Sequence, residues 1–362
     1  MEGLALKRTY PQPDLEFWRG RKVFVTGHTG FKGSWLTFWL VQLGAKVCGC
    51  SLPPATQPSL FNLLGIKNHI DHHIVDIRRY DSVSKTIKRF KPDVIIHLAA
   101  QALVLPSLDN PLKTFETNVL GTLHLLEAVR EINTVRAIVV VTSDKVYRNI
   151  EVGRPFREFD CLGGKDPYSA SKAASEMVIN CYRASFLKNH GVAISAVRAG
   201  NVIGGGDWSK NRIIPDAIRA WSSKRVLVVR NPLATRPWQH VLEPLAAYLR
   251  LAELLITNPS IAEDYNIGPC QDANSKVKDV IIRARNSFRL GKIKWEKPNA
   301  DSIEAQKLSL DAGRARRILG IKPVWGLNET VSRTVHWYRK YLKGEDVKKL
   351  CHEDIKTFLD SR

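Results

Sequence analysis

Short runs of β-branched and aliphatic residues recur through the first half of the chain, and helix-like segments separate them. The clearest runs lie at 22–26, 45–50, 93–97, 139–141 and 192–197. Uninterrupted apolar runs of this length are typical of parallel strands that are buried on both faces. Their alternation with helices predicts an α/β fold built on a doubly wound parallel sheet.

The run at 139–141 ends abruptly in polar residues. Thr142, Ser143, Asp144 and Lys145 place hydroxyl, carboxylate and ammonium groups directly after a buried strand. We expect the carboxyl end of this strand to open into a functional site.

Tyr168 and Lys172 follow at a spacing of four residues. If a helix begins here, both side chains lie on one face, one turn apart. An ammonium beside a phenol stabilises the phenolate, so the tyrosine can act as a base near neutral pH. The same spacing also occurs in solvated helix pairs, and the neighbouring motifs argue against that alternative.

Three glycines separate the strand at 22–26 from a helix expected at 34–43. Gly27, Gly30 and Gly33 stand at intervals of three residues. Glycines in a strand–turn–helix context allow a tight turn and a close approach of the backbone to a pyrophosphate at the helix N-terminus. The alternative is a purely structural turn.

Later strand ends carry further signals for a dinucleotide. Ser51 ends the second strand where an acidic residue would bind the adenosine ribose, so this position does not distinguish NAD from NADP. Asp76 and Ile77 are suited to the adenine amino group and ring. The strand at 93–101 ends in small residues that let a dinucleotide lie against the backbone, and Asn118 begins or continues the next helix.

Composition indicates a folded protein larger than one ordinary domain. The chain has 362 residues, of which 44% are hydrophobic and 25% charged. Residues 1–7 contain no apolar signal-peptide core, and no apolar run is long enough to cross a membrane. Six scattered cysteines form neither a disulfide framework nor a metal motif, which favours a reduced, cytoplasmic protein. The run at 71–73, Asp-His-His, is interpreted as a surface cluster, and no metal is expected.

The net charge of +20 suggests an anionic partner, either a nucleic acid or a small anionic substrate. The densest basic stretch is 276–297, with eight Lys and Arg residues against two acidic ones. Its pattern predicts an amphipathic helix followed by a strand, with the charges on a solvated face. No nucleic-acid-binding motif accompanies it, so no nucleic-acid partner is expected.

Together these motifs resemble the extended short-chain dehydrogenase/reductase superfamily over most of the chain. Within it, four longer strings resemble the CDP-glucose 4,6-dehydratases; they lie at 27–35, 142–145, 198–208 and 230–244. The resemblance implies a Rossmann-type domain, mainly residues 1–198, and a smaller, discontinuous substrate-binding lobe, mainly 199–362. A segment around 235–262 is expected to return to the Rossmann domain.

The reaction that the resemblance implies is redox-neutral dehydration of CDP-D-glucose with bound NAD. Hydride leaves C4 while Tyr168 takes the 4-hydroxyl proton, water leaves from C6 with help from a general acid, and the hydride returns to C6. Asp144 beside Ser143 suits the acid. Lys145 stands where related dTDP-glucose dehydratases carry a Glu. It acts either as the C5 base, which requires a depressed pKa, or as a cation beside the enolate.

The catalytic residues implied are Ser143, Asp144, Lys145, Tyr168 and Lys172. The cofactor contacts implied are Gly27, Thr29, Gly30, Phe31, Lys32, Gly33, Ser51, Asp76, Ile77, Ala99, Ala100, Gln101, Asn118, Tyr168, Lys172 and Ala199. The substrate contacts implied are Gln101, Asn201, Arg212, Ile213, Arg219, Arg230, Arg236 and Asn266. The arginines suit a diphosphate because a guanidinium offers forked, charge-assisted donors.

The resemblance also implies a homodimer or homotetramer that associates through a helix bundle, with no membrane partner. One departure is that no Arg follows Gln101, where relatives often carry one. Two alternatives remain open: a nucleotide-sugar 4-epimerase, which would not need Asp144 and Lys145, and a catalytically silent NAD(P)-sensing or RNA-binding protein.

Overall fold

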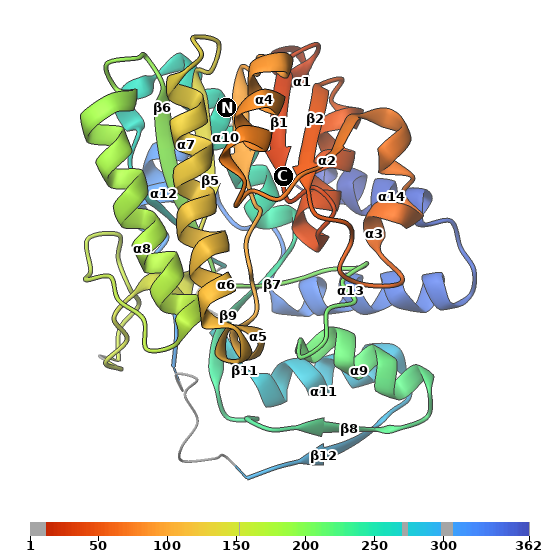
Figure 1. Cartoon of the computed structure of the whole chain (residues 1–362). Helices are drawn as coiled ribbons and strands as arrows, with labels where there is room; N and C mark the ends of the chain where they lie inside the picture. The colour runs from red at the N-terminus through yellow and green to blue at the C-terminus, as the bar shows by residue number, and fades with distance from the viewer. Residues whose placement is uncertain (1–11, 152, 270–273, 298–306, 362) are drawn as a thin grey trace, which may run out of the picture.

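The computed structural model of the protein describes residues 12–151, 153–269, 274–297 and 307–361. Its main layer is a seven-stranded, entirely parallel sheet with the strand order β10-β6-β5-β4-β1-β2-β3 (Figure 1). The strands are β1 (Lys22–Thr26), β2 (Lys46–Ser51), β3 (Asp71–Ile74), β4 (Val94–His97), β5 (Ala137–Val141), β6 (Ala193–Ala199) and β10 (Tyr265–Ile267). The predicted doubly wound parallel sheet is confirmed.

Helices cover both faces of this sheet. One face carries α4 (Tyr80–Phe90), α7 (Gly121–Arg130) and α8 (Pro167–Tyr182), and the other carries α2 (Phe31–Gln42) and α10 (Leu242–Thr257). Side chains alternate along each strand, so Val139 of β5 enters one core and Val140 enters the other. This two-sided burial explains why the strands appear in the sequence as unbroken apolar runs.

The connections on these faces contain several short helices. They are α1 (Leu15–Trp18), α3 (Leu60–Leu63), η1 (Ile66–His69), α5 (Val104–Asp109), α6 (Pro111–Phe115), the π-helix η2 (Glu116–Leu120), η3 (Asp144–Val146), the π-helix η4 (Arg183–Leu187) and η5 (Pro259–Ile261).

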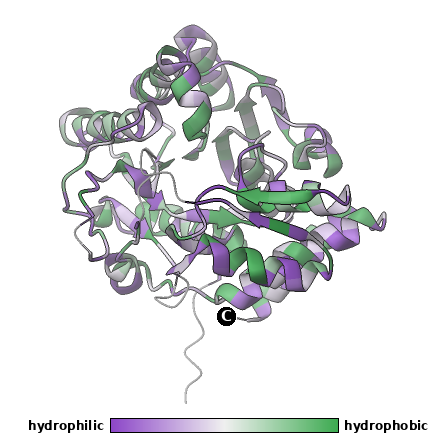
Figure 2. Ribbon diagram, turned by 90° about the horizontal axis from the view of Figure 1, so that it is seen from below, coloured by the Kyte–Doolittle hydropathy of each residue, from purple (hydrophilic) through white to green (hydrophobic). Residues whose placement is uncertain are grey.

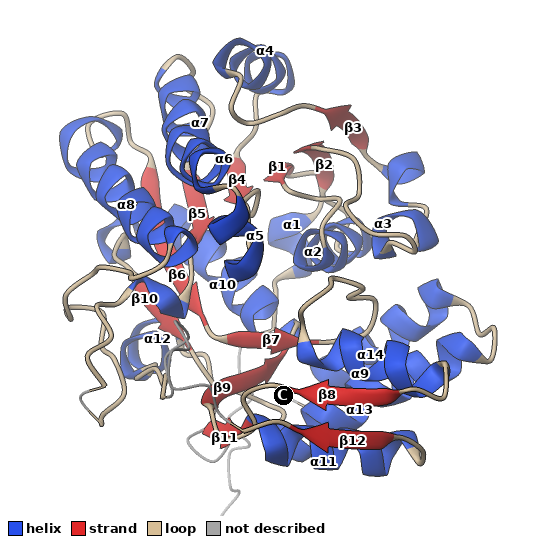
Figure 3. Cartoon of the chain, turned by 60° about the horizontal axis from the view of Figure 1, so that its bottom comes forward, coloured by secondary structure: helices blue, strands red, loops and turns tan. Residues whose placement is uncertain are grey.

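A second group of elements lies beyond the carboxyl ends of the sheet strands (Figure 3). It contains a three-stranded sheet of β11 (Asn274–Lys276), β9 (Thr235–His240) and β7 (Asn201–Ile203), and a parallel pair of β12 (Lys292–Trp295) and β8 (Val226–Val229). Its helices are α9 (Ile213–Ser222), α11 (Val277–Phe288) and α13 (Leu327–Leu342). Two further helices, α12 (Gly313–Leu319) and α14 (Val347–Asp360), pack beside the main sheet. The helix and strand predicted within 276–297 are confirmed as α11 and β12.

Several later segments pack against the main sheet. Helix α10 contacts β5 and β6, β10 pairs with β6, and Phe358 of α14 lies edge-on against Trp39 of α2 at 6.2 Å between ring centroids. The C-terminal half therefore contributes to the main sheet layer both inside and outside the segment 235–262.

Candidate functional site

The polar residues singled out in the sequence gather where β1, β4, β5 and β6 end. Because these strands are parallel, their carboxyl ends lie along one edge of the sheet. That edge faces β7, β9 and α9 of the second group of elements (Figures 1 and 3). The geometry therefore places the candidate site between the two layers.

The turn after β1 is shaped by its glycines. Gly27 has a φ of +74°, and a Cβ there would come within 2.7 Å of the Ala99 backbone nitrogen. A Cβ on Gly33 would lie 2.1 Å from the Gly27 carbonyl oxygen, so the first turn of α2 cannot tolerate a side chain there. Gly30 differs, because the nearest atom to its hypothetical Cβ lies at 3.4 Å.

Helix α2 begins at Phe31 with Gly30 as its N-cap, and no side chain caps it. Its first-turn N–H groups and the positive end of its dipole are therefore suited to a phosphate. The glycine cradle and the uncapped N-terminus fit the pyrophosphate of a dinucleotide.

The end of β2 is joined to the turn after β1 through two hydroxyl groups. Thr29 Oγ1 lies 2.8 Å from Ser51 Oγ and donates to the Leu52 carbonyl oxygen at 2.8 Å. Asp76 is held by Arg78, with 2.7 Å between Nη2 and Oδ2, and this guanidinium lowers the pKa of Asp76. Ile77 is buried and packs against the backbone at Gly121.

Asn118 connects the end of β4 to helix α8. Its Oδ1 accepts from the Gln101 backbone N–H at 2.8 Å, and its Nδ2 donates to the Gln101 carbonyl at 3.0 Å and to Ser171 Oγ at 2.8 Å. The Gln101 side chain is held in turn by Leu103 and Thr114. Ala99 and Ala100, which are half-buried, precede this clamp, and the buried Ala199 ends the adjacent strand β6.

The predicted catalytic hydroxyl, acid and tyrosine are brought together. Ser143 Oγ donates to Asp144 Oδ1 at 3.1 Å, and the Tyr168 hydroxyl is hydrogen-bonded to Ser143. Lys172 lies one turn along α8 and donates from Nζ to the Val141 carbonyl oxygen at 3.0 Å. The fifth residue, Lys145, is half-buried in the same short helix η3, and its backbone N–H donates to Ser143 Oγ.

Burial dominates the electrostatics of this group. It raises the pKa of Tyr168 to about 12 and lowers the pKa of Lys172 to about 8. Lys172 is not among the main influences on the Tyr168 pKa, so its stabilisation of the phenolate stays a prediction. Desolvation outweighs the hydrogen bond from Ser143 and the charge of Arg212, which act in the lowering direction.

Asp144 responds to burial in the same direction as Tyr168, because both are acids whose charged form is disfavoured by burial. Desolvation raises its pKa, although the positive charges of Lys145, Arg236 and Lys32 act against the shift. The protonated carboxyl is thereby favoured beside Ser143. Lys32, from the first turn of α2, has its pKa lowered to about 7 by burial and by the charges of Arg212 and Lys172.

Two predicted substrate arginines lie near the catalytic group. Arg212 precedes α9, pairs with Asp207 at 2.9 Å between Nη1 and Oδ2, and acts electrostatically on Tyr168. Arg236 is buried in β9, and its positive charge partly opposes the rise in the pKa of Asp144. Asn201 opens β7 and Ile213 opens α9, both half-buried.

The other predicted substrate residues lie in different surroundings. Arg219 donates to the carbonyls of Trp208 and Ser209, where it fixes the 207–209 loop. Arg230 is exposed just beyond β8. Asn266 is completely buried, accepts from the Tyr147 hydroxyl at 2.6 Å, and donates to two backbone carbonyls.

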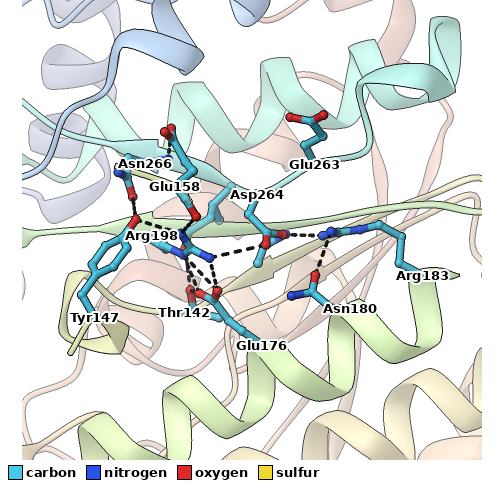
Figure 4. Close-up of polar contacts among 12 residues, drawn as sticks. Thr142, Tyr147, Glu158, Glu176, Asn180, Arg183, Arg198, Glu263, Asp264 and Asn266 are labelled. Atoms are coloured by element: carbon cyan, nitrogen blue, oxygen red, sulfur yellow. Dashed lines mark hydrogen bonds and ion pairs between the residues drawn. The ribbon is translucent and has the colours of Figure 1, made fainter. Parts of the chain in front are cut away.

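A buried ion pair beneath the site was not predicted. Glu176, one turn beyond Lys172, pairs with Arg198 of β6 and accepts from Thr142 Oγ1 at 2.6 Å (Figure 4). Arg198 also donates to the Tyr147 hydroxyl at 2.8 Å, which links this pair to Asn266. The sequence signal for this pair was a glutamate on the inward face of helix α8. Its partner lies on strand β6, and the sequence does not show that the two meet.

The described residues contain one group that could hold a metal ion. Cys48, Asp71 and His73 place one ligand atom each within 4.8 Å of one another. Arg89 contacts both Asp71 and His73, and burial with the Asp71 charge raises the pKa of the Cys48 thiol. A cation already satisfies the carboxylate and the thiol stays protonated, so the group suits an ion pair better than a metal.

With this geometry in place, comparison with known proteins decides the family. The profile described as GDP-mannose 4,6 dehydratase matches residues 24–334. The chain belongs to this family. Across 355 residues it is 42% identical to the CDP-glucose 4,6-dehydratase of Salmonella typhimurium, covering 96% of this chain and 99% of that protein. The resemblance to CDP-glucose 4,6-dehydratases is thus confirmed.

Solved structures of similar proteins show the same fold at lower identity. The UDP-glucose 4-epimerase of Thermotoga maritima with UDP-glucose has a TM-score of 0.76 at 21% identity, covering 89% of this chain and 99% of that chain. The dTDP-glucose 4,6-dehydratase of Bacillus anthracis with NAD has a TM-score of 0.73 at 23% identity, covering 90% and 98%. These neighbours confirm the Rossmann-type fold of this family.

Proposed function

We propose that the protein dehydrates CDP-D-glucose to CDP-4-dehydro-6-deoxy-D-glucose with NAD as its cofactor. The observation that carries this proposal is the position of Asp144. It is buried, its pKa is raised, and it is hydrogen-bonded to Ser143, which is hydrogen-bonded in turn to the Tyr168 hydroxyl. Dehydration needs an acid for the departing hydroxyl, whereas epimerisation at C4 does not. The 42% identity to a CDP-glucose 4,6-dehydratase over nearly the whole chain supports the sugar and the nucleotide.

The residues at the end of β1 fit the cofactor. The glycine cradle and the uncapped N-terminus of α2 suit its pyrophosphate, and the clamp between Asn118 and Gln101 forms a neighbouring wall. When bound, NAD⁺ supplies reversible hydride chemistry, first at C4 and then at C6 of the sugar.

Tyr168 is assigned to the 4-hydroxyl proton, with Ser143 as the hydroxyl that orients it. Because burial raises the pKa of Tyr168 to about 12, the phenolate needs nearby positive charge. Arg212 already acts in this direction. Lys172, anchored on the Val141 carbonyl, holds a further positive charge one helical turn away.

Asp144 and Lys145 are assigned to the elimination. Asp144 donates its proton to the C6 hydroxyl, which leaves as water. Lys145 works on the C5 side, either by taking the C5 proton or by stabilising the enolate charge. Arg212 and Arg236 suit the diphosphate of the substrate, because both lie beside the catalytic group.

We also infer that two or four copies associate through the outer side of α5, α6, η2 and α8. Large apolar side chains are exposed there although the elements pack against one another: Leu108, Leu112, Phe115, Leu120 and Met177. A bundle formed with the same helices of a second copy would bury them.

A cytoplasmic location is part of the same proposal. The described cysteines, Cys48, Cys50, Cys161, Cys181 and Cys351, are all unpaired. Among the described helices, none is both long enough and apolar enough to span a bilayer. The product is a precursor of the deoxysugars found in surface polysaccharides such as the lipopolysaccharide O-antigen.

The test is to incubate the purified protein with CDP-, dTDP-, GDP- and UDP-glucose, each with and without added NAD⁺. Conversion of CDP-glucose to a 4-keto-6-deoxy sugar, with no net NADH, is the expected result. A C4 epimer in place of that product would favour the epimerase. If no sugar reacted although NAD⁺ bound, the enzymatic proposal would fail.

A further inference from the structure

The strand pair β8 and β12 has one buried side and one exposed side. Leu227 and Val229 point into the core, towards α9 and α11. On the opposite side Val226 and Val228 are 48% and 46% exposed. The parallel register pairs Val226 with Lys292 and Val228 with Lys294, so these four side chains share the exposed side, which we call the basic face.

The basic face lies in the most positive part of the chain. Segments 224–230 and 276–297 carry eleven Lys and Arg residues against Asp279 and Glu296, a net charge of +9 within a total of +20. No described carboxylate forms an ion pair with any of the eleven. Elsewhere many arginines are paired, as Arg78 and Arg198 are.

Apolar and cationic groups are interleaved on this side of the molecule. Figure 2 views the molecule from below, the side where Figure 1 places β8 and β12, and shows hydrophobic and hydrophilic strand positions next to one another. Leu290, at the turn into β12, adds a side chain that is 70% exposed. Lysines and arginines that merely face solvent do not need exposed valine and leucine side chains beside them.

We propose that the basic face docks the protein on an anionic lipid surface. Lysines attract acidic headgroups, while Val226, Val228 and Leu290 enter the interfacial layer. The face is the side of a two-stranded sheet, and a headgroup layer demands no shape complementarity. The association is peripheral, and it departs from the expectation that the protein has no membrane partner.

The charge and composition of the basic face disfavour two other binding partners, a second copy of the chain and a single-stranded nucleic acid. A second copy seated symmetrically would bring the same lysines against one another, at a cost in like-charge repulsion. Single-stranded nucleic acid would need aromatic side chains for base stacking. Trp295 is 36% exposed, but it lies on the opposite side of the pair, in register with the buried Val229, and so is not part of the basic face.

The test is co-sedimentation of the full-length protein with lipid vesicles. We expect binding to vesicles that contain about 30% phosphatidylglycerol, loss of that binding in high salt, and little binding to phosphatidylcholine alone. The double variant Lys292→Glu/Lys294→Glu should bind at least about tenfold more weakly. The variant Val226→Ser/Val228→Ser should weaken binding without changing the net charge.

The matched control is Lys188→Glu/Lys356→Glu, which makes the same charge change at two exposed positions outside the basic face. This control should bind the vesicles as the wild type does, and thermal unfolding should show that all variants fold. Equal losses in the control and in the Lys292/Lys294 variant would overturn the proposal. So would wild-type binding to a single-stranded oligonucleotide or to itself, with no binding to the vesicles.

Discussion

Asp144 is the residue on which the proposed elimination depends most. Replacing it with Asn keeps the shape and removes the transferable proton. We expect formation of the 4-keto-6-deoxy product to fall by about a hundredfold or more. Oxidation at C4, followed by the absorbance of reduced cofactor, should persist because Ser143, Tyr168 and Lys172 remain.

The control for this variant is Asp81→Asn, a conservative change at an exposed helix position. It should leave both steps unchanged. If Asp144→Asn made the product at the normal rate, the acid would have to be another group.

The buried carboxyl of Asp354 leads to a prediction about how the stability of the fold depends on pH. Burial raises its pKa from 3.8 to about 7, and Arg333 offers only a 3.9 Å contact. The folded state therefore holds a proton that the unfolded state loses, so this carboxyl makes the protein less stable as pH rises from 3.8 to about 7. Asp354→Asn should stabilise the fold near pH 8 by up to about 4 kcal/mol, and hardly at all near pH 4.

Thermal unfolding at the two pH values measures the effect, with the exposed Asp360→Asn as the matched control. A gain in Tm that was the same at both pH values would show that the carboxyl proton is not its cause.

At the scale of elements, Gly30 and Gly33 at the start of α2 have different roles. Gly33 leaves no room for a side chain, whereas Gly30 does. A methyl at Gly30 meets nothing closer than 3.4 Å, so Gly30→Ala should fold normally. We expect that methyl to crowd the pyrophosphate proposed at this turn, so NAD⁺ affinity should fall by about tenfold or more. Calorimetric titration measures the affinity, and Gly326→Ala, where nothing lies within 4 Å, is the control. Unchanged affinity would place the pyrophosphate elsewhere.

Elements defined by local signals were predicted well from the sequence. The β1 strand at Lys22–Thr26 was predicted in full, and α2 and α8 begin within a few residues of the predicted positions. Apolar runs, glycine spacing and the Tyr-Lys spacing are all properties of neighbouring residues, so the sequence shows them directly.

Features that depend on distant residues were not predictable in the same way. The Glu176–Arg198 pair joins α8 to β6, and Cys48 reaches Asp71 and His73 across two strands. The burial that raises the pKa of Tyr168 likewise results from the packing of the whole site. Sequence spacing specifies neither a partner on another strand nor a degree of burial.

At the scale of the whole molecule, the exposed apolar side of α6 and α8 predicts association. Leu112 is 71% exposed and Met177 is 62% exposed. The variant Leu112→Glu/Met177→Glu should shift the proposed dimer or tetramer toward the 40.8 kDa monomer in light scattering. Leu15→Glu/Leu342→Glu, at exposed positions on other helices, should not. A monomeric wild type would rule out the proposed bundle.

In the proposed reaction one site oxidises C4, eliminates water and returns the same hydride to C6. The most direct measurement is the fate of deuterium placed at C4 of CDP-glucose and followed by NMR. We expect deuterium at C6 of a 4-keto-6-deoxy product, together with solvent hydrogen at C5. Deuterium that stayed at C4 of an epimerised sugar, or that was lost to solvent, would contradict it.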